Sequence, residues 1–233
     1  MKITHLITRI RVLAVLALLA STGAHADLMY ARLGGAAVYD ATTNLTWVSN
    51  ANLAATNTFG VSGIDPAGSM SWAIANSWIA GMDAANYLGY NNWALPTTLQ
   101  PDATCGSQKS GGVSYGYGCT GSQMGNLFYN ALGGVAHTSI TTTHNANYNL
   151  FSNFQSGNYW SGTEYAPNNR LAWNFHFSNG GQYVSTKSNS MHALAVRSGD
   201  VGDPSAVPEP ASVALLGIGL LGLMGARRRK QAA

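Results

Sequence analysis

Two short apolar runs, one near each end of the chain, set the limits of what this sequence can fold into. One covers residues 12–20 and the other residues 211–226. Each is shorter than the ~20 apolar residues of a typical membrane-spanning helix, and each lies beside basic residues. The segment 27–200 between them has no long Pro- or Gly-rich linker and no repeat of fixed period. It is long enough to bury the core of one domain.

The N-terminal run has the features of a secretory signal peptide covering residues 1–26. Ala24 and Ala26 form the small-x-small pattern at which a signal peptidase cuts. The basic residues before the run are Lys2, Arg9 and Arg11. We therefore expect an exported protein whose mature chain begins at Asp27. The alternative is an uncleaved membrane anchor, which the short length of the run disfavours.

The C-terminal run belongs to a segment with three parts. A linker at 201–210 ends in the motif Val207-Pro208-Glu209-Pro210. The apolar part at 211–226 would cover roughly 24 Å as a helix, against ~30 Å for the hydrocarbon core of a bilayer. The tail at 227–233 begins with a basic cluster of Arg227, Arg228, Arg229 and Lys230. We expect this cluster to stay cytoplasmic, which places 27–207 on the outer side of the membrane.

This three-part tail resembles the PEP-CTERM sorting signal. The resemblance implies a Gram-negative envelope protein that is held briefly in the inner membrane and processed by an exosortase near the Pro-Glu-Pro motif. It also implies an association with exopolysaccharide and biofilm matrix. Glu209 and its flanking prolines are then recognition elements for the processing enzyme, not catalytic groups. An ordinary tail anchor with a proline-containing linker is the alternative.

The positions of the charges argue against a nucleic-acid partner. The chain has 12 Lys and Arg against 9 Asp and Glu, a formal charge of +3. Seven of the cations stand in the terminal segments, so the balance between Asp27 and Val207 is 5 − 8 = −3. A nucleic-acid-binding protein needs a stripe of Lys and Arg to displace counterions. Extracellular polysaccharide is the partner that we expect instead.

Two helices are predicted in the first two thirds of the domain. The first follows a cap at Ser69 or Ser71 and has apolar residues at helical spacing: Trp72, Ala75, Ile79 and Met82. The second starts at Thr120 or Ser122 and stops at Gly133, and its apolar face consists of Met124, Leu127, Phe128 and Ala131.

Strand patterns concentrate in the last third of the domain. Period-two alternation over 171–177 and a turn at Asn179-Gly180-Gly181 predict a hairpin with 182–186. Residues 193–197 are expected to form a closing strand, and 39–48 a strand pair or a strand and turn. These elements predict a mixed α+β domain with two short helices before a C-terminal antiparallel meander. The order is not a βαβ repeat, which disfavours a nucleotide-binding parallel sheet.

A set of motifs is spread over residues 38–200. The motifs are Val38-Tyr39-Asp40, Leu45-Thr46-Trp47, Trp93-Ala94-Leu95-Pro96-Thr97, Gly121 to Leu127, Tyr159-Trp160-Ser161-Gly162-Thr163-Glu164-Tyr165, Ala172-Trp173-Asn174-Phe175 and Ala195-Val196-Arg197. Together they resemble a bacterial domain of unknown function that also occurs at the C-terminus of collagen-like surface adhesins. The family commonly has Arg at the position of Ala94, so an ion pair from that residue is lost here. The resemblance implies a fold related to C-type lectins and formylglycine-generating enzymes.

Cys105 and Cys119 are the two cysteines of the chain, and export places them in an oxidising compartment. We predict that they form a disulfide. It would close a fifteen-residue segment rich in Gly, Ser and Tyr, which contributes about 3 kcal/mol in the chain-entropy model. The alternative is a catalytic or copper-binding cysteine pair of the formylglycine-generating type, although the sequence has no matching active-site motif.

No motif for catalysis, metal binding or cofactor binding stands out in the sequence. The histidines of the exported region lack the spacing of zinc ligands; they are His137, His144, His176 and His192. One Gly-x-Ser-x-Gly pattern occurs, at Gly112-Val113-Ser114-Tyr115-Gly116, but it lies in a Gly-, Ser- and Tyr-rich stretch and no helix pattern follows it directly, as the turn that carries a serine nucleophile requires. We therefore predict a protein that is not an enzyme and uses no metal and no cofactor.

Glu164 stands in a nearly uncharged stretch among aromatic and amide side chains. Carboxylate and amide oxygens suit sugar hydroxyls or Ca²⁺, and aromatic faces stack on pyranose rings. A possible ligand surface therefore consists of Trp160, Glu164, Tyr165 and Asn174. The alternative is a structural ion pair of Glu164 with Arg170 or Arg197. Tryptophans are also more often core residues than ligand platforms, and we expect a core role for five of the six in the domain: Trp47, Trp72, Trp93, Trp160 and Trp173.

The sequence as a whole predicts an exported envelope protein sorted through its C-terminal signal. Its domain is expected to be a structural or carbohydrate-interacting component of the exopolysaccharide matrix. The alternative is a secreted enzyme, either formylglycine-generating-like or a glycosidase, with a site near Glu164.

Overall fold

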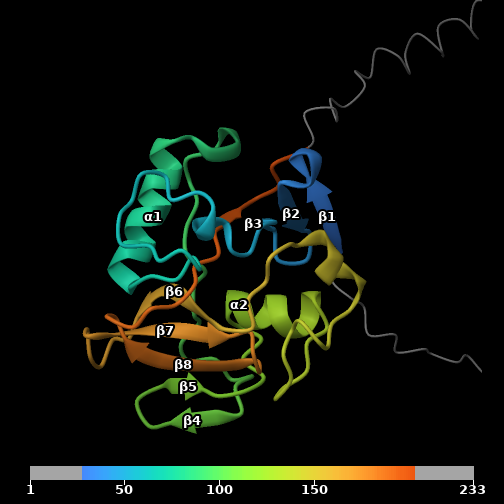
Figure 1. The fold of residues 1–233 in the computed structure, drawn as a ribbon. Coiled ribbons are helices and arrows are strands. Elements are labelled where there is room, and N and C mark those ends of the chain that lie inside the picture. The colour runs from blue at the N-terminus through green and yellow to red at the C-terminus, as the bar shows by residue number, and fades with distance from the viewer. Residues whose placement is uncertain (1–27, 203–233) are drawn as a thin grey trace, which may run out of the picture.

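The computed structural model describes residues 28–202 (Figure 1). The predicted signal peptide at 1–26, the motif at 207–210, the apolar helix at 211–226 and the basic tail at 227–233 lie outside these residues. Within 28–202, none of the helices has the length and apolar character needed to cross a membrane. The described part is a mixed α+β domain with two α-helices and antiparallel sheets, as predicted.

The first sheet brings together strands from both ends of the domain. Its strands, in spatial order, are β1 (Met29–Arg32), β2 (Ala37–Asp40), β3 (Leu45–Val48) and β9 (Val196–Ser198). The β2–β3 pair confirms the strand pair predicted at 39–48.

The closing strand predicted at 193–197 belongs to the first sheet, not to the meander. We expected it to close the C-terminal meander, but β9 pairs antiparallel with β3. The reason lies in its side chains and backbone bonds. Val196 packs with Trp47 in a buried cluster, and the Val48 N–H donates to the carbonyl oxygen of Ala195 at 3.0 Å. The segment therefore completes the N-terminal sheet.

The second sheet is the predicted meander, with three antiparallel strands. They are β6 (Asn158–Glu164), β7 (Leu171–His176) and β8 (Gly181–Thr186). Gly180 in the β7–β8 turn has φ +81°, a conformation that suits glycine. The register of β6 against β7 shifts between Trp160 and Glu164. Such an irregularity bends a strand locally, and it precedes the segment that carries Tyr165.

Both helices begin close to their predicted starts. In α1 (Trp72–Ala84), the Ser71 hydroxyl caps the helix by accepting the Ile74 N–H. The short α2 (Gln123–Asn126) continues as a π-helical turn over Leu127–Ala131 and stops before Gly133, which has φ +70°. A Cβ atom at Gly125 would lie 1.8 Å from the Cys119 carbonyl oxygen. Only glycine lets α2 approach the Cys119 backbone so closely.

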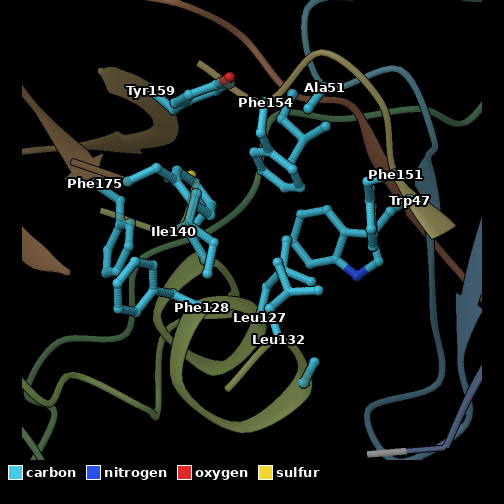
Figure 2. Close-up of a cluster of buried hydrophobic side chains, with 14 of the residues drawn as sticks. Trp47, Ala51, Leu127, Phe128, Leu132, Ile140, Phe151, Phe154, Tyr159 and Phe175 are labelled. Carbon is cyan, nitrogen blue, oxygen red and sulfur yellow. The ribbon is translucent and has the colours of Figure 1, made fainter. Parts of the chain in front are cut away.

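The central strand β7 is covered on both faces, so the domain has two hydrophobic cores. Figure 2 shows the first, in which Trp47, Phe128 and Phe175 bring together β3, the π-helical turn and β7. The second packs against α1 and includes Trp160 and Ala172. Four of the five predicted core tryptophans are confirmed as buried, whereas Trp72 is half-buried: the buried ones are Trp47, Trp93, Trp160 and Trp173.

A hairpin that the sequence patterns do not predict lies beside β8. It consists of β4 (Ser107–Lys109) and β5 (Val113–Tyr115), which pair antiparallel. Gly116 and Gln182 attach the end of the hairpin to β8 through two backbone hydrogen bonds of 2.9 and 2.8 Å. Figure 1 shows β5 and β4 continuing the layer of the meander beyond β8.

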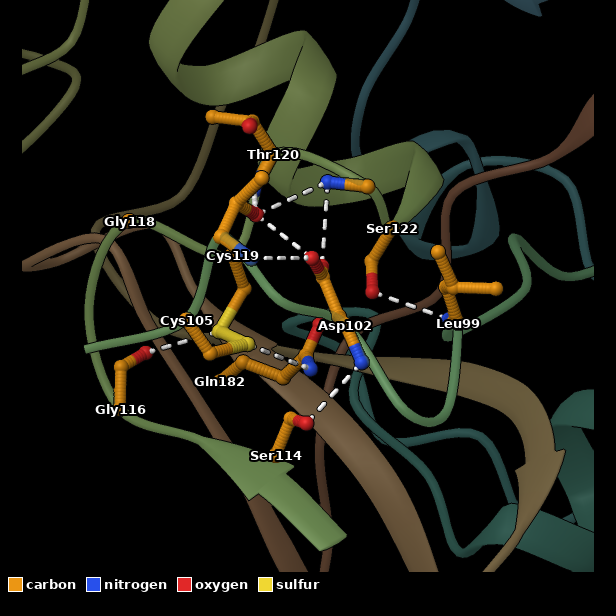
Figure 3. The surroundings of a disulfide bond; sticks show 12 residues. Leu99, Asp102, Cys105, Ser114, Gly116, Gly118, Cys119, Thr120, Ser122 and Gln182 are labelled. Atoms are coloured by element: carbon orange, nitrogen blue, oxygen red, sulfur yellow. Dashed lines mark hydrogen bonds between the residues drawn. A yellow bond between two sulfur atoms is a disulfide. The ribbon is translucent and has the colours of Figure 1, made fainter. Parts of the chain in front are cut away.

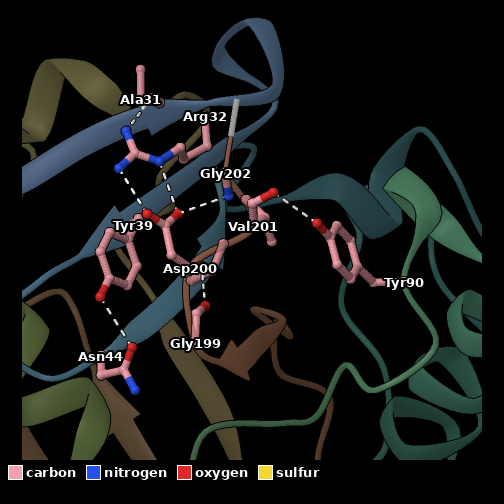
Figure 4. A network of polar contacts seen from close by, with 10 residues as sticks. Ala31, Arg32, Tyr39, Asn44, Tyr90, Gly199, Asp200, Val201 and Gly202 are labelled. Atoms are coloured by element: carbon pink, nitrogen blue, oxygen red, sulfur yellow. Dashed lines mark hydrogen bonds and ion pairs between the residues drawn. The ribbon is translucent and has the colours of Figure 1, made fainter. Parts of the chain in front are cut away.

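Hydrogen bonds connect residues 199–201, near the end of the described chain, to the first sheet and to Tyr90 (Figure 4). Arg32 of β1 donates to both carboxylate oxygens of Asp200, at 2.8 and 2.9 Å. The Tyr90 hydroxyl donates to the Val201 carbonyl at 2.7 Å, and the Thr46 hydroxyl donates to the Gly199 carbonyl at 2.6 Å. These bonds hold residues 199–201 against the first sheet and Tyr90.

The Arg32–Asp200 pair predicts part of the acid sensitivity of the domain. The hydrogen bond from Arg32 lowers the pKa of Asp200 below its usual value. A carboxyl group whose pKa is lower in the folded state stabilises the fold above its unfolded pKa. This stability is lost as pH falls below about 4. We therefore expect Asp200→Asn to flatten the decrease in unfolding free energy between about pH 4 and pH 2.

Urea denaturation at a series of pH values measures this effect. Asp65, whose pKa is also lowered, chiefly by its hydrogen bond with Ser69, stays in the variant and preserves part of the dependence. Identical pH profiles for the variant and the natural protein would contradict the assignment.

Candidate functional site

The predicted disulfide between Cys105 and Cys119 is present at the base of the β4–β5 hairpin (Figure 3). The Gln182 side-chain amide of β8 donates to Sγ of Cys105 over 3.8 Å. Asp102, buried beside the bridge, accepts the backbone N–H groups of Thr104 and Gly121. The hairpin is therefore held by the disulfide, by β8 and by the loop that leads into α2.

Asp102, Cys105 and Cys119 are also the one set of potential metal ligands that lies close together within residues 28–202. Metals bind the thiolate form of cysteine, and both sulfurs here are joined to each other. The pairing likewise leaves no free thiol for the alternative of a catalytic or copper-binding cysteine pair. The chemistry of this cluster is therefore structural in the oxidised protein.

A groove runs between the hairpin and the end of the meander that carries the β6–β7 turn. It consists of two adjoining cavities of about 320 and 220 Å³, which share the residues Val113, Tyr165 and Trp173. The larger cavity is also lined by residues 100–101, 111–112 and 163–167. The other residues of the smaller one are Lys109, Tyr115, Tyr183 and Val184. We refer to the two cavities together as the aromatic groove.

Of the four residues of the predicted ligand surface, two line a cavity and two are buried in the domain. Glu164 and Tyr165 line the aromatic groove. Trp160 and Asn174 are fully buried, so neither can meet a ligand that arrives from solvent, and the predicted surface is corrected at these two positions. They are cross-strand partners on β6 and β7. Trp160 donates its indole N–H to the Met70 carbonyl at 2.8 Å, and Asn174 donates to the Ser185 hydroxyl at 3.0 Å.

Glu164 forms an ion pair, but its partner is Lys187 instead of the expected Arg170 or Arg197. The Lys187 ammonium group also lies 4.1 Å from the centre of the Trp72 ring. Arg197 is engaged elsewhere, because it donates to the Asn92 side chain at 2.8 Å and stacks on Tyr90. The Lys187 contact uses Oε2 of Glu164. Within the described chain, Oε1 accepts no hydrogen bond.

Neutral polar groups complete the lining of the groove. The Thr163 hydroxyl oxygen accepts the Thr98 N–H at 2.9 Å, which leaves the hydroxyl proton to be donated. The Gln100 amide holds the hairpin wall by exchanging two hydrogen bonds with the Ser114 backbone, at 2.8 and 2.7 Å. Burial and a hydrogen bond with Tyr117 raise the pKa of Tyr183 to about 12, so this phenol stays uncharged at neutral pH.

The histidines of the domain do not form a metal-binding cluster among the described residues. Burial lowers the pKa of His176 and of His192, which favours the neutral ring. His144 bonds the Ile140 carbonyl at 2.6 Å through Nδ1, and His137 packs against the Tyr117 ring. Each of these four rings therefore has a local packing role.

Two protein families match different parts of the chain. The PEP-CTERM protein-sorting motif matches residues 206–230, and the Lcl C-terminal domain matches residues 36–197, which include the whole aromatic groove. No curated protein matches the chain. The sorting motif implies processing by an exosortase and an exported protein associated with the cell surface. The chain thus belongs to the Lcl C-terminal domain family and carries a PEP-CTERM sorting motif after that domain.

Proposed function

We propose that this protein is a non-enzymatic, carbohydrate-interacting component of the exopolysaccharide matrix. A signal peptide directs its export, the C-terminal helix anchors it transiently in the inner membrane, and an exosortase processes it near Pro208-Glu209-Pro210. Its domain has a C-type-lectin-like fold and needs no metal or cofactor. The aromatic groove is the observation that carries the carbohydrate-binding role.

The groove has the two kinds of groups that carbohydrate recognition requires. Aromatic and apolar surface around Tyr165, Tyr115 and Val113 suits the faces of pyranose rings, and a few placed polar groups suit their hydroxyls. Glu164 is the one carboxylate among the lining residues, and it is already paired with Lys187. A glycosidase uses two carboxyl groups that flank the scissile bond. The lining therefore favours binding over catalysis.

Fractionation of the native host tests the sorting and binding roles together. We expect mass spectrometry of the mature protein to find a C-terminus near the Pro-Glu-Pro motif and no Arg227–Ala233 tail. The mature protein should also be retained on immobilised matrix polysaccharide from the same cells. An intact basic tail on the mature protein would refute the sorting role, and no retention at high protein concentration would refute the binding role.

A further inference from the structure

We propose that the aromatic groove binds an uncharged, hydroxyl-rich segment of a polysaccharide chain. This inference rests on the proposed carbohydrate-binding function and adds the site and the chemical class of the sugar. The site consists of the β5 strand and the hairpin tip on one wall and residues 163–167 on the other, with Trp173 between them.

The shape of the groove suits a chain better than a single small molecule. The two cavities share Val113, Tyr165 and Trp173, so they adjoin one another along these three side chains. Tyr165 lies between them, packs edge-on against Trp173 with ring centres 5.7 Å apart, and is half-buried. An apolar ring that is held in place and still partly exposed is a platform for a sugar ring at the middle of the site.

The charges of the lining disfavour ligands of either sign in the larger cavity. Glu164 is its one charged residue. Because its carboxylate is paired with Lys187, the larger cavity has no net positive charge that would attract a uronate, sulfate or phosphate group. A cationic ligand would have to displace Lys187, which already neutralises Glu164. An uncharged ligand needs neither an attracting charge nor the displacement of Lys187.

The smaller cavity has one cation, Lys109, which is exposed on β4 and lies 5.0 Å from the centre of the Tyr115 ring. A single solvated ammonium group contributes little at physiological salt, where exposed charges are screened within about 8 Å. Tyr183 in the same cavity stays neutral because its pKa is raised to about 12. Lys109 alone therefore does not make the groove a site for acidic polysaccharide.

The free hydrogen-bonding capacity of the larger cavity matches a hydroxyl group. Thr163 has a hydroxyl proton to donate, and Oε1 of Glu164 has lone pairs to accept. A sugar hydroxyl is both a donor and an acceptor, so adjacent hydroxyls can use both groups. This complementarity is the positive argument for a polyol over a purely apolar ligand.

Affinity electrophoresis of the mature protein tests the proposal. The native gels contain one of two neutral polysaccharides, dextran or hydroxyethyl cellulose, or the acidic polysaccharide alginate. We expect at least one neutral gel to retard the protein, and changing salt between about 50 and 500 mM should not abolish the retardation. Tyr165→Ala should weaken the affinity by about tenfold, whereas Tyr165→Phe, which keeps the ring, should not. Tyr30→Ala removes a tyrosine from β1, outside the groove, that is more exposed than Tyr165, and it serves as the control.

Two results would overturn the inference while leaving the proposed function standing. One is salt-sensitive retardation by alginate alone, lost in Lys109→Gln, which would make the ligand acidic. The other is retardation in a neutral gel that Tyr165→Ala leaves unchanged while its thermal unfolding is normal, which would place the sugar elsewhere. Failure of the proposed function itself has a different result, namely no binding to the native matrix polysaccharide.

Discussion

Replacing both Cys105 and Cys119 with alanine should lower the free energy of unfolding by about 3 kcal/mol. Without the disulfide, the unfolded chain regains the conformational freedom of the segment 105–119, whose ends are 14 residues apart in the sequence. Alanine is preferred to serine as the replacement because both positions are buried and a hydroxyl group there would have to find a hydrogen-bond partner. Urea denaturation of the natural protein and the variant measures the difference.

The same substitution should weaken binding of the native matrix polysaccharide, since the bridge holds the base of the hairpin that forms one wall of the groove. Gln182 of β8 would also lose its contact with Sγ of Cys105. Reduction of the natural protein with dithiothreitol should reproduce both effects. A variant that loses less than about 0.5 kcal/mol, and binds the polysaccharide normally, would show that Gly116 and Gln182 suffice to hold the hairpin.

The sequence located most of the regular elements because their signals are local. Ser71 and Gly133 mark helix ends because the N-cap and the positive-φ stop are local backbone conformations that recur in unrelated proteins. The alternation of apolar and polar residues likewise predicts β7 without knowledge of the neighbouring strands. The same alternation could not reveal that both faces of β7 are covered. Asn174 looked like a solvent-facing residue, yet the second core covers it and Ser185 accepts a hydrogen bond from its amide.

The candidate site was only half visible in the sequence for a similar reason. Glu164 and Tyr165 stand out locally, as a carboxylate and an aromatic ring in an uncharged stretch. The opposite wall comes from Val113 and Tyr115, some fifty residues earlier, in a segment whose Gly and Ser content is typical of a loop. Two very short strands form there because the disulfide and the Gly116–Gln182 bridge hold them against β8. Only tertiary structure brings the two walls together.

A core role and a ligand-binding role of Trp160 predict different effects of its substitution: the first predicts a loss of stability, the second a loss of binding. Its ring is fully buried in the second core, and its indole N–H is bonded to Met70. Trp160→Ala should therefore destabilise the domain by about 3–5 kcal/mol, because it removes a large buried side chain and leaves a cavity. Thermal or urea unfolding of the purified variant measures this loss.

Trp160→Phe keeps much of the buried ring and removes the indole N–H, so its effect on stability should be clearly smaller than that of Trp160→Ala. The Met70 carbonyl retains its bond from the Met191 N–H at 3.0 Å, which limits the cost of losing the indole donor. Tyr165→Ala, at a half-buried position in the groove, should affect binding far more than stability. A Trp160→Ala protein that unfolds like the natural one but no longer binds polysaccharide would reverse this assignment and return Trp160 to the ligand surface.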